Sequence, residues 1–225
     1  MKITFYGHSS FGLEVAGKNL LFDPFITPNE LASAVDISQI PADYILLSHA
    51  HFDHVADVET IAKRTGAKII SNYEIVTHFG TKELNGHPMN HGGRWNFSFG
   101  NVHYVNAIHT SSFSDGSNGG APGGFVITTE EGSFYYSGDT ALTYDMKLIG
   151  EEYDLKFAML CMGDNFTMGV KDAVKAADFV GANKVIGMHF DTFGYIKVDH
   201  EASKKAFADA GKELHLMEIG QSIEF

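Results

Sequence analysis

Cysteine is nearly absent from this chain of 225 residues, in which Cys161 is the single example. A disulfide framework is therefore excluded. Cys161 lies inside the apolar run FAMLCMG, which predicts a buried structural thiol rather than a nucleophile. Long apolar runs are missing too: YILLS and KFAMLCM are far shorter than the roughly 20 residues that a membrane span needs. The opening MKITFYGHSS lacks the apolar core of a signal peptide. We expect a cytoplasmic protein that does not associate with a membrane.

Positive charge is also scarce. Lys and Arg number 16 against 28 Asp and Glu, so the formal net charge is -12, and no segment gathers basic residues. Because phosphate contacts dominate nucleic-acid affinity, this surface excludes a nucleic acid as the expected partner. We expect a small-molecule substrate instead, which can be anionic if a local positive centre receives it.

The hydrophobic pattern predicts an α/β fold. Residues of hydrophobic type make up 44% of the chain, which is enough for a full core. Strand-like runs are KITFYG (2–7), FGLEV (11–15), NLLFD (19–23), YILLS (44–48), GAKIIS (66–71), WNFSF (95–99), VHYVNAI (102–108), GFVITT (124–129), SFYYSG (133–138), KFAMLCM (156–162), KVIGM (184–188) and LHLME (214–218). Helix-like stretches cover 53–64, 73–79 with Asn72 as N-cap, 170–180 and 201–210. Two sheet-forming halves that each carry helices predict a single domain over 1–225, built as a four-layer αββα sandwich rather than a doubly wound sheet.

One stretch, SSFSDGSNGGAPGG at 111–124, fits neither a strand nor a helix. Loops of this length inside compact domains are often functional. We therefore expect it to form a wall or lid of the site.

The run HAHFDH, residues 49–54, directly follows the strand-like YILLS. In an extended segment, residues two apart project to the same side, so His49 and His51 can direct their imidazoles at one point. Asp53 and His54 follow where the chain turns into a helix, and they would project toward a second point nearby. Six residues thus offer paired ligands to two metals. Imidazole and carboxylate suit Zn, Mn, Fe and Ni, whereas calcium or magnesium is bound mainly by oxygens.

Three more ligand-type residues stand at the ends of other strand-like runs. His109 ends VHYVNAIH, Asp139 follows FYYSG, and His189 ends KVIGMH. In α/β architectures, sites collect beyond the carboxyl ends of strands. We therefore expect these three residues and the HAHFDH run to meet in one metal site.

HAHFDH resembles the H-x-H-x-D-H signature of the metallo-β-lactamase superfamily, and His109, the GDT run at Asp139 and the MH run at His189 follow in the order and approximate spacing of that superfamily. The resemblance covers essentially the whole chain. YGHSSF, GDNFTMG and MHFDTF look like a narrower branch of small metal-dependent hydrolases. That branch is related to ascorbate-phosphate lactonases and, more distantly, to N-acyl-phosphatidylethanolamine phospholipase D.

The resemblance implies two divalent transition metal ions, with zinc preferred and Mn, Fe or Ni as alternatives. His49, His51 and His109 would hold the first ion, while Asp53, His54 and His189 would hold the second, and Asp139 would bridge them. The two ions carry more positive charge than the two carboxylates return, so a bridging water should ionise near neutral pH. The implied function is hydrolysis, in which a metal-bridging hydroxide attacks a small ester, lactone or phosphodiester.

A redox function and non-catalytic metal binding are the two alternatives to hydrolysis. The flavodiiron members of the superfamily carry glutamate where this chain has His51, and a flavin domain follows, so His51 favours hydrolysis over redox chemistry. A non-catalytic metal-binding protein is the other alternative, because ligands establish binding and not turnover. The nuclease branches need a large inserted domain or a basic arm, and the acidic chain offers neither. Relatives of this size often assemble, which makes a homo-oligomer an open expectation.

Further residues are candidates for the surroundings of the metals. His8, which follows the first strand, is expected to donate a proton or orient substrate, and we assign catalytic roles to His8 and Asp53; the alternative for His8 is a structural turn histidine. Asp23 ends NLLFD and is expected to accept a hydrogen bond from the outer nitrogen of a ligand histidine, the alternative being a loop cap. Asp164 and Asn165 follow another strand and are candidates for substrate contact at the rim, or for starting the next helix, whose N-terminus near Met168 to Val170 could receive an anion.

Overall fold

The computed structural model describes residues 1–225 and contains two sheets of seven strands each. The first sheet comprises β1 (Lys2–Gly7), β2 (Ser10–Val15), β3 (Lys18–Phe22), β4 (Tyr44–Leu46), β5 (Lys68–Asn72), β6 (Gly86–Met89) and β14 (Ser222–Glu224). The second comprises β7 (Arg94–Phe97), β8 (Gly100–Asn106), β9 (Gly123–Thr129), β10 (Gly132–Tyr136), β11 (Leu155–Cys161), β12 (Lys184–Met188) and β13 (Glu213–His215). Their orders are β14-β1-β2-β3-β4-β5-β6 and β13-β12-β11-β10-β9-β8-β7.

Each sheet combines antiparallel and parallel strands. In the first, β1, β2 and β3 form an antiparallel meander, and β3 to β6 run parallel. In the second, β7 to β10 are antiparallel, and β10 to β13 run parallel. The parallel portions place the carboxyl ends of several strands at one edge of the molecule, which is where functional sites form in such sheets.

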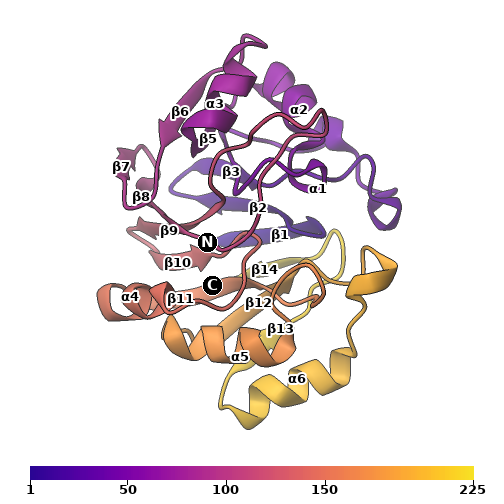
Figure 1. Ribbon diagram of the computed structural model, residues 1–225, viewed down its shortest axis with the longest axis vertical. Helices are drawn as coiled ribbons and strands as arrows, with labels where there is room; N and C mark the ends of the chain where they lie inside the picture. The colour runs from indigo at the N-terminus through magenta and orange to yellow at the C-terminus, as the bar shows by residue number, and fades with distance from the viewer.

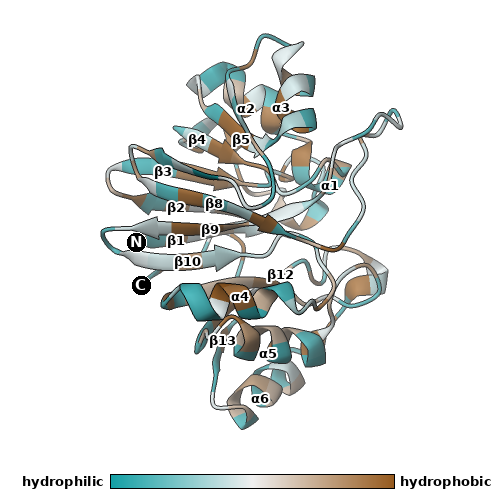
Figure 2. Cartoon of the chain, turned by 60° about the vertical axis from the view of Figure 1, so that its left-hand side comes forward, coloured by the Kyte–Doolittle hydropathy of each residue, from teal (hydrophilic) through white to brown (hydrophobic).

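Helices cover the outer face of each sheet. The first sheet carries α1 (Phe52–Val55), α2 (Val58–Thr65) and α3 (Tyr73–Gly80), and the second carries α4 (Asp145–Glu152), α5 (Val170–Phe179) and α6 (His200–Asp209). Figures 1 and 2 show the two sheets stacked face to face, with α2 and α3 on one outer side and α4, α5 and α6 on the other. The predicted four-layer αββα sandwich is therefore confirmed.

The main hydrophobic core lies between the sheets and under the helices of the second one. Phe11, Phe22, Phe125 and Phe134 are fully buried there, and the thiol of Cys161 is buried with them, as the sequence predicted. Burial raises the pKa of Cys161 to about 11, since it disfavours the thiolate, and the nearby Asp139 adds to the effect. A thiol with so high a pKa is unsuited to act as a nucleophile at neutral pH.

The helix predicted over 53–64 is broken into α1 and α2 by Ala56 and Asp57. The buried Asp57 carboxylate accepts hydrogen bonds from the backbone of Ile26 at 2.6 Å and of Thr27 at 2.8 Å. It thereby ties the loop after β3 to the junction of the two helices, a long-range contact that local helix periodicity cannot reveal. The predicted N-cap of α3 is confirmed, because the Asn72 side chain accepts from the backbone of Ile75 at 2.9 Å.

One α-helix and two strands went unpredicted, namely α4, β6 and β14, as did the short 3₁₀ helices at Glu30–Ala32, Ile37–Gln39 and Gly194–Ile196. β6 reads GHPM and β14 reads SIE, so neither shows the alternation of β-branched and aromatic residues that marks a strand. β14 pairs with β1, which brings the last strand of the chain into the sheet formed by the first. None of the helices is long and apolar enough to cross a membrane.

Candidate metal centre

The predicted ligand residues meet at the carboxyl ends of four strands. His49 follows β4, His109 follows β8, Asp139 follows β10 and His189 follows β12. The remaining ligand-type residues of HAHFDH lie beside them, because α1 begins inside the motif at Phe52 and carries Asp53 and His54 in its single turn. Both sheets therefore contribute to one cluster, as the sequence predicted.

One group consists of His49, His51 and His109, each of which offers a ring nitrogen within 4.8 Å of the others. His49 Nε2 lies 3.0 Å from His51 Nδ1. The other ring nitrogens are engaged elsewhere: His49 Nδ1 lies 2.9 Å from the Ser48 hydroxyl, and His51 Nε2 lies 3.3 Å from Thr110 Oγ1. Since the Ser48 hydroxyl donates to Asp23, it must accept from His49 Nδ1–H, so that His49 Nε2 carries the lone pair of the ring and presents it to His51 Nδ1.

A second group consists of His8, Asp53, His54 and His189, whose ligand atoms also lie within 4.8 Å of one another. Asp53 Oδ2 lies 3.8 Å from both His54 Nε2 and His189 Nε2. Three of these residues were predicted as ligands of one ion, and the structure adds His8 to their neighbourhood.

Asp139 lies between the two groups. Its Oδ2 is within 4 Å of four imidazole nitrogens: 3.9 Å from His49 Nε2, 3.6 Å from His109 Nε2, 3.4 Å from His54 Nε2 and 2.9 Å from His189 Nε2. The resemblance implied a bridging role for Asp139, which stays a prediction.

Asp23 supports the cluster from behind. Its carboxylate is fully buried and accepts hydrogen bonds from the Ser48 backbone at 2.8 Å, the Ser48 hydroxyl at 2.5 Å, His54 Nδ1 at 2.8 Å and the Tyr136 hydroxyl at 2.7 Å. A hydrogen bond of this kind fixes the tautomer and the orientation of a ligand histidine. The expected contact of Asp23 with an outer nitrogen is thus present, and it turns His54 Nε2 toward Asp139.

The donor set fits divalent transition metals. His54 Nε2 and Asp139 Oδ1 are buried polar atoms without a hydrogen-bond partner, which is unusual because such an atom costs free energy. The lone pair of His49 Nε2 also faces His51 Nδ1 at hydrogen-bond distance. Bare imidazole nitrogens and carboxylate oxygens that converge in this way are the ligands that Zn, Mn, Fe and Ni take.

The charges of the metal-free cluster are strongly coupled. Burial lowers the pKa of His49 well below its usual value, and the neighbouring His54 lowers it further. Burial acts in the same direction on His189, but the Asp139 carboxylate outweighs it and raises the pKa of His189 to about 9. Burial would raise the pKa of Asp139, yet the adjacent His189 and His54 hold it well below its usual range. Asp139 is therefore ionised and ready to bind a cation.

His8 contacts Asp53 rather than solvent. Its Nε2 lies 3.1 Å from Asp53 Oδ2 and its Nδ1 lies 2.9 Å from Thr192 Oγ1. Burial, with a further effect of His189, lowers the pKa of His8 to about 4, so the ring is neutral near pH 7. Because a carboxylate only accepts, the proton of the neutral ring is on Nε2, and the Thr192 hydroxyl donates to Nδ1.

Three residues of this centre adopt a backbone conformation that L-residues rarely take. His8, Asp23 and His189 have φ angles of 57°, 39° and 57°. Strained conformations of this kind cluster at functional sites because the surroundings must hold them in place. Here a backbone hydrogen bond of 2.9 Å from His189 N to the His8 carbonyl joins two of the three.

Asp164 and Asn165 were expected at the rim of this centre. The structure places both at φ angles of 64° and 54° in a turn before α5, and Asp164 lines a separate pocket with Lys171 and Lys197. The Asp164 carboxyl carbon is 3.1 Å from where a Cβ on Gly169, the N-cap of α5, would be. The carboxylate therefore lies against the helix N-terminus that was expected to receive an anion.

The Gly-rich loop at 111–124 lies against the back of the HAHFDH motif. The Ser111 hydroxyl accepts from the Ala50 backbone at 3.1 Å and donates to the Gly119 carbonyl at 2.9 Å. A Cβ on Gly119 would approach the Ala50 Cβ to 2.3 Å, so the loop needs glycine there to pack this closely. The loop supports the motif, and the pocket beside Asp53 is lined by other segments.

A family model described as a beta-lactamase superfamily domain matches residues 18–190. The chain belongs to the metallo-β-lactamase superfamily. Within this superfamily it is 60% identical over 224 residues to a UPF0173 metal-dependent hydrolase of Flavobacterium johnsoniae, with 100% of both chains covered. It is 42% identical over 231 residues to YtkL of Bacillus subtilis, described in the same words, again with 100% of both chains covered. The resemblance found in the sequence is confirmed, and the protein is a metal-dependent hydrolase.

A solved structure supports the same assignment. Igni18, a metallo hydrolase of Ignicoccus hospitalis, superposes with a TM-score of 0.91 at 33% identity, over 100% of this chain and 98% of that one. The superfamily fold is therefore retained along the whole length of the chain.

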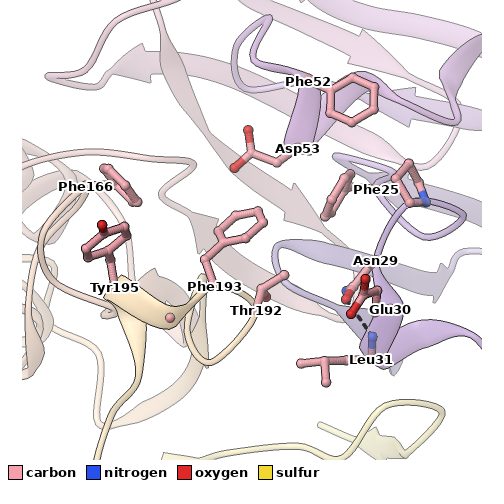
Figure 3. Close-up of a pocket in the computed structure, with 12 residues that line it drawn as sticks. Phe25, Asn29, Glu30, Leu31, Phe52, Asp53, Phe166, Thr192, Phe193 and Tyr195 are labelled. Carbon is pink, nitrogen blue, oxygen red and sulfur yellow. Dashed lines mark hydrogen bonds between the residues drawn. The ribbon is translucent and has the colours of Figure 1, made fainter.

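Sequence reasoning missed the pocket beside the centre of this metallo-β-lactamase-fold hydrolase. Figure 3 shows Asp53 in its wall among aromatic side chains. They come from segments far apart in the chain: Phe25, Phe52, Phe166, Phe193 and Tyr195. Phenylalanine is more often buried than exposed, so the sequence carries no signal that marks these residues as a pocket wall. In the folded chain, Phe52, Phe166 and Phe193 are exposed.

Proposed function

We propose that this protein is a dinuclear hydrolase that cleaves a small ester, lactone or phosphodiester. The observation that carries the proposal is the position of Asp139, whose Oδ2 lies within 4 Å of His49 and His109 of one group and of His54 and His189 of the other. A carboxylate in this position can serve two ions at once.

The two groups divide the ligands as follows. We assign one ion to His49, His51 and His109, the other to Asp53, His54 and His189, and both to Asp139. Zinc is the preferred ion, with Mn, Fe and Ni as alternatives of suitable ligand chemistry. When bound, such ions lower the pKa of a water molecule toward neutrality and polarise the oxygen of the bond to be cleaved.

The chain's own residues position this chemistry. Asp23 and Ser48 hold the rings of His54 and His49 by their Nδ1 atoms, so that both Nε2 atoms face the centre. His8 donates to Asp53 and fixes a carboxylate that borders both the ligand cluster and the pocket. We assign the catalytic roles to Asp53 and His8 on this basis.

For an ester or lactone, the reaction consumes one water. A bond forms between the water oxygen and the carbonyl carbon, and the bond from that carbon to the alcohol oxygen breaks. The proton that the water loses ends on the leaving alcohol oxygen after passing through groups at the site. Asp53 is the proposed carrier, because it is the carboxylate of the cluster that lines the pocket.

Metal content combined with activity tests the proposal. Purified protein incubated with zinc or manganese is expected to hold two ions per chain and to hydrolyse a model lactone or bis(4-nitrophenyl) phosphate. Asp139→Asn is expected to lose at least one ion and most of the activity. Asp154→Asn, which alters a surface carboxylate, serves as the matched control and retains both.

The outcomes separate the alternatives. Two bound ions without turnover of any ester, lactone or phosphodiester would favour a non-catalytic metal-binding protein. Bound iron with electron transfer to oxygen would favour the redox alternative. Wild-type protein that binds neither zinc nor manganese contradicts the proposal itself.

A further inference from the structure

Exposed hydrophobic side chains concentrate at one place on this protein. Ten large hydrophobic residues are strongly exposed, and five of them line the pocket beside Asp53: Leu31, Phe52, Phe166, Phe193 and Tyr195. Tyr195 is 80% exposed. Single exposed hydrophobic residues are ordinary, whereas a contiguous group of them marks a binding site.

The pocket has the size and the form of a small-molecule site. Its volume is about 760 Å³, within the range of typical ligand pockets. The rings of its wall contact one another in favourable geometry: Phe25 and Phe52 are edge to face at 5.8 Å, as are Phe166 and Tyr195 at 6.3 Å. Figure 3 shows these side chains arranged around an open space next to Asp53.

The charges of the lining are all negative. Glu30 and Asp53 are its ionisable acids, and no lysine, arginine or histidine lines it. A phosphate or carboxylate bound here would meet no basic side chain and would be repelled by Glu30. The lining therefore disfavours an anionic group, while its aromatic rings and the Leu31 side chain offer apolar contact.

We infer that the pocket binds an uncharged aromatic or bulky apolar group of the substrate, joined directly to the ester or lactone that is cleaved. This inference rests on the proposed hydrolytic function and narrows it, because it disfavours substrates with a second anionic group remote from the cleaved bond. Asp53 belongs both to the ligand cluster and to the pocket wall, so a group held by the aromatic residues lies next to the proposed reaction centre.

The 192–195 segment connects the pocket to the centre. Thr192 Oγ1 lies 2.9 Å from His8 Nδ1, and the ring of Phe193 contacts that of His8 edge to face at 5.4 Å. Two residues of the pocket wall thus contact His8, the residue that donates a hydrogen bond to Asp53.

The test compares four methyl or acetyl esters by proton release with zinc- or manganese-loaded enzyme. Methyl phenylacetate and benzyl acetate carry a neutral aromatic ring on the acyl and alcohol sides, monomethyl succinate carries a carboxylate, and methyl acetate is the small reference. At least one aromatic ester is expected to exceed methyl acetate in kcat/KM by about tenfold, the effect of partly burying one ring. Monomethyl succinate is expected to fall below methyl acetate.

Two variants test whether the preference for aromatic esters depends on the pocket. Phe166→Ala and Tyr195→Ala remove exposed side chains, so the fold should persist, and each is expected to lower the aromatic preference several-fold while hydrolysis of methyl acetate continues. Tyr73→Ala, at a tyrosine that is 60% exposed outside the pocket, is the matched control and keeps the preference. Binding of the neutral dye Nile red to metal-free protein gives a readout without turnover and should weaken in the same two variants only.

The results distinguish failure of the inference from failure of the proposed function. Turnover in which monomethyl succinate equals or exceeds the aromatic esters overturns the inference and leaves the hydrolase standing. No turnover of any ester, of a model lactone or of bis(4-nitrophenyl) phosphate overturns the proposed function and the inference with it. A wild-type dimer that becomes monomeric in Phe166→Ala and Tyr195→Ala, with ester preference unchanged, assigns the pocket to a second copy and overturns the inference.

Discussion

Replacement of Asp23 by alanine tests the hydrogen-bond network behind the metal centre. The Asp23 carboxylate accepts four hydrogen bonds and is fully buried. The Ser48 and Tyr136 hydroxyls can rotate toward other acceptors, but the Ser48 backbone N–H and the His54 Nδ1–H cannot. Two buried donors would then be unpaired, at about 1–3 kcal/mol each, so Asp23→Ala should lower the free energy of unfolding by about 2–6 kcal/mol.

The same variant should weaken metal binding, because His54 loses the partner that directs its Nε2 toward Asp139. Loss of such a partner typically lowers metal affinity by about 10- to 100-fold. Urea unfolding of the metal-free protein measures the first effect, and zinc competition with a chromophoric chelator measures the second.

Asp57→Ala is the matched control for Asp23→Ala. Asp57 is also a buried carboxylate that accepts two backbone hydrogen bonds, but it contacts no ligand residue. The Asp57→Ala protein should lose about as much stability as Asp23→Ala. Its zinc affinity should stay within about threefold of wild type, which is less than the change expected when a ligand histidine loses its hydrogen-bond partner. If Asp23→Ala leaves zinc affinity unchanged, or if both variants lower it equally, the orienting role of Asp23 is refuted.

Three further predictions concern His8, the protonation of His189 and the Gly-rich loop at 111–124. His8→Ala should lower kcat about 10- to 100-fold while zinc stoichiometry stays at that of wild type, and a variant with unchanged kcat would remove His8 from the mechanism. The Asp139 carboxylate outweighs burial and raises the pKa of His189 to about 9 in the metal-free fold; this stabilisation is therefore present below pH 6.5 and lost as the pH rises through 9. The carboxylates of Asp139 and Asp23 outweigh burial at His54 too and raise its pKa well above the usual value. Zinc binding near pH 7.5 must then displace protons from His189 and His54, which a pH-indicator dye detects, and binding without proton release would contradict the assignment of these two ligands. Gly119→Ala should lower the free energy of unfolding by about 1–3 kcal/mol, because the added Cβ would lie 2.3 Å from the Ala50 Cβ. A urea unfolding curve that matches wild type would show that the loop moves to accommodate the methyl group.

The arrangement of the metal centre could be predicted because its residues follow regular elements. His189 comes directly after a strand, and His49 and His109 come within three residues of one. The local pattern of apolar residues reveals such strands in the sequence. Parallel strands then bring their carboxyl ends to one edge, so sequence position translates into spatial proximity.

The pocket could not be predicted in the same way. Phe25 and Phe52 lie near the first sheet and Phe166 and Phe193 near the second, all in loops or at a helix start. Loops have no periodicity from which the direction of a side chain follows, and a phenylalanine is more often buried than exposed. These phenylalanines form one pocket wall only because the two sheets stack and bring their loops together.

The break between α1 and α2 shows a similar limit. The residues from Asp53 to Arg64 suit a continuous helix, and it is the contact of Asp57 with the loop at 26–27 that divides them. Asp164 shows why position after a strand is ambiguous, since it allowed either a site residue or the start of the next helix, and the carboxylate lies against the start of α5.

The most direct test of the dinuclear centre is anomalous X-ray scattering from crystals of the zinc-loaded protein. The account predicts two zinc peaks, one among His49, His51 and His109 and one among Asp53, His54 and His189, with an Asp139 oxygen in contact with both. A single peak that lies elsewhere, or no peak in protein soaked with zinc, would contradict it.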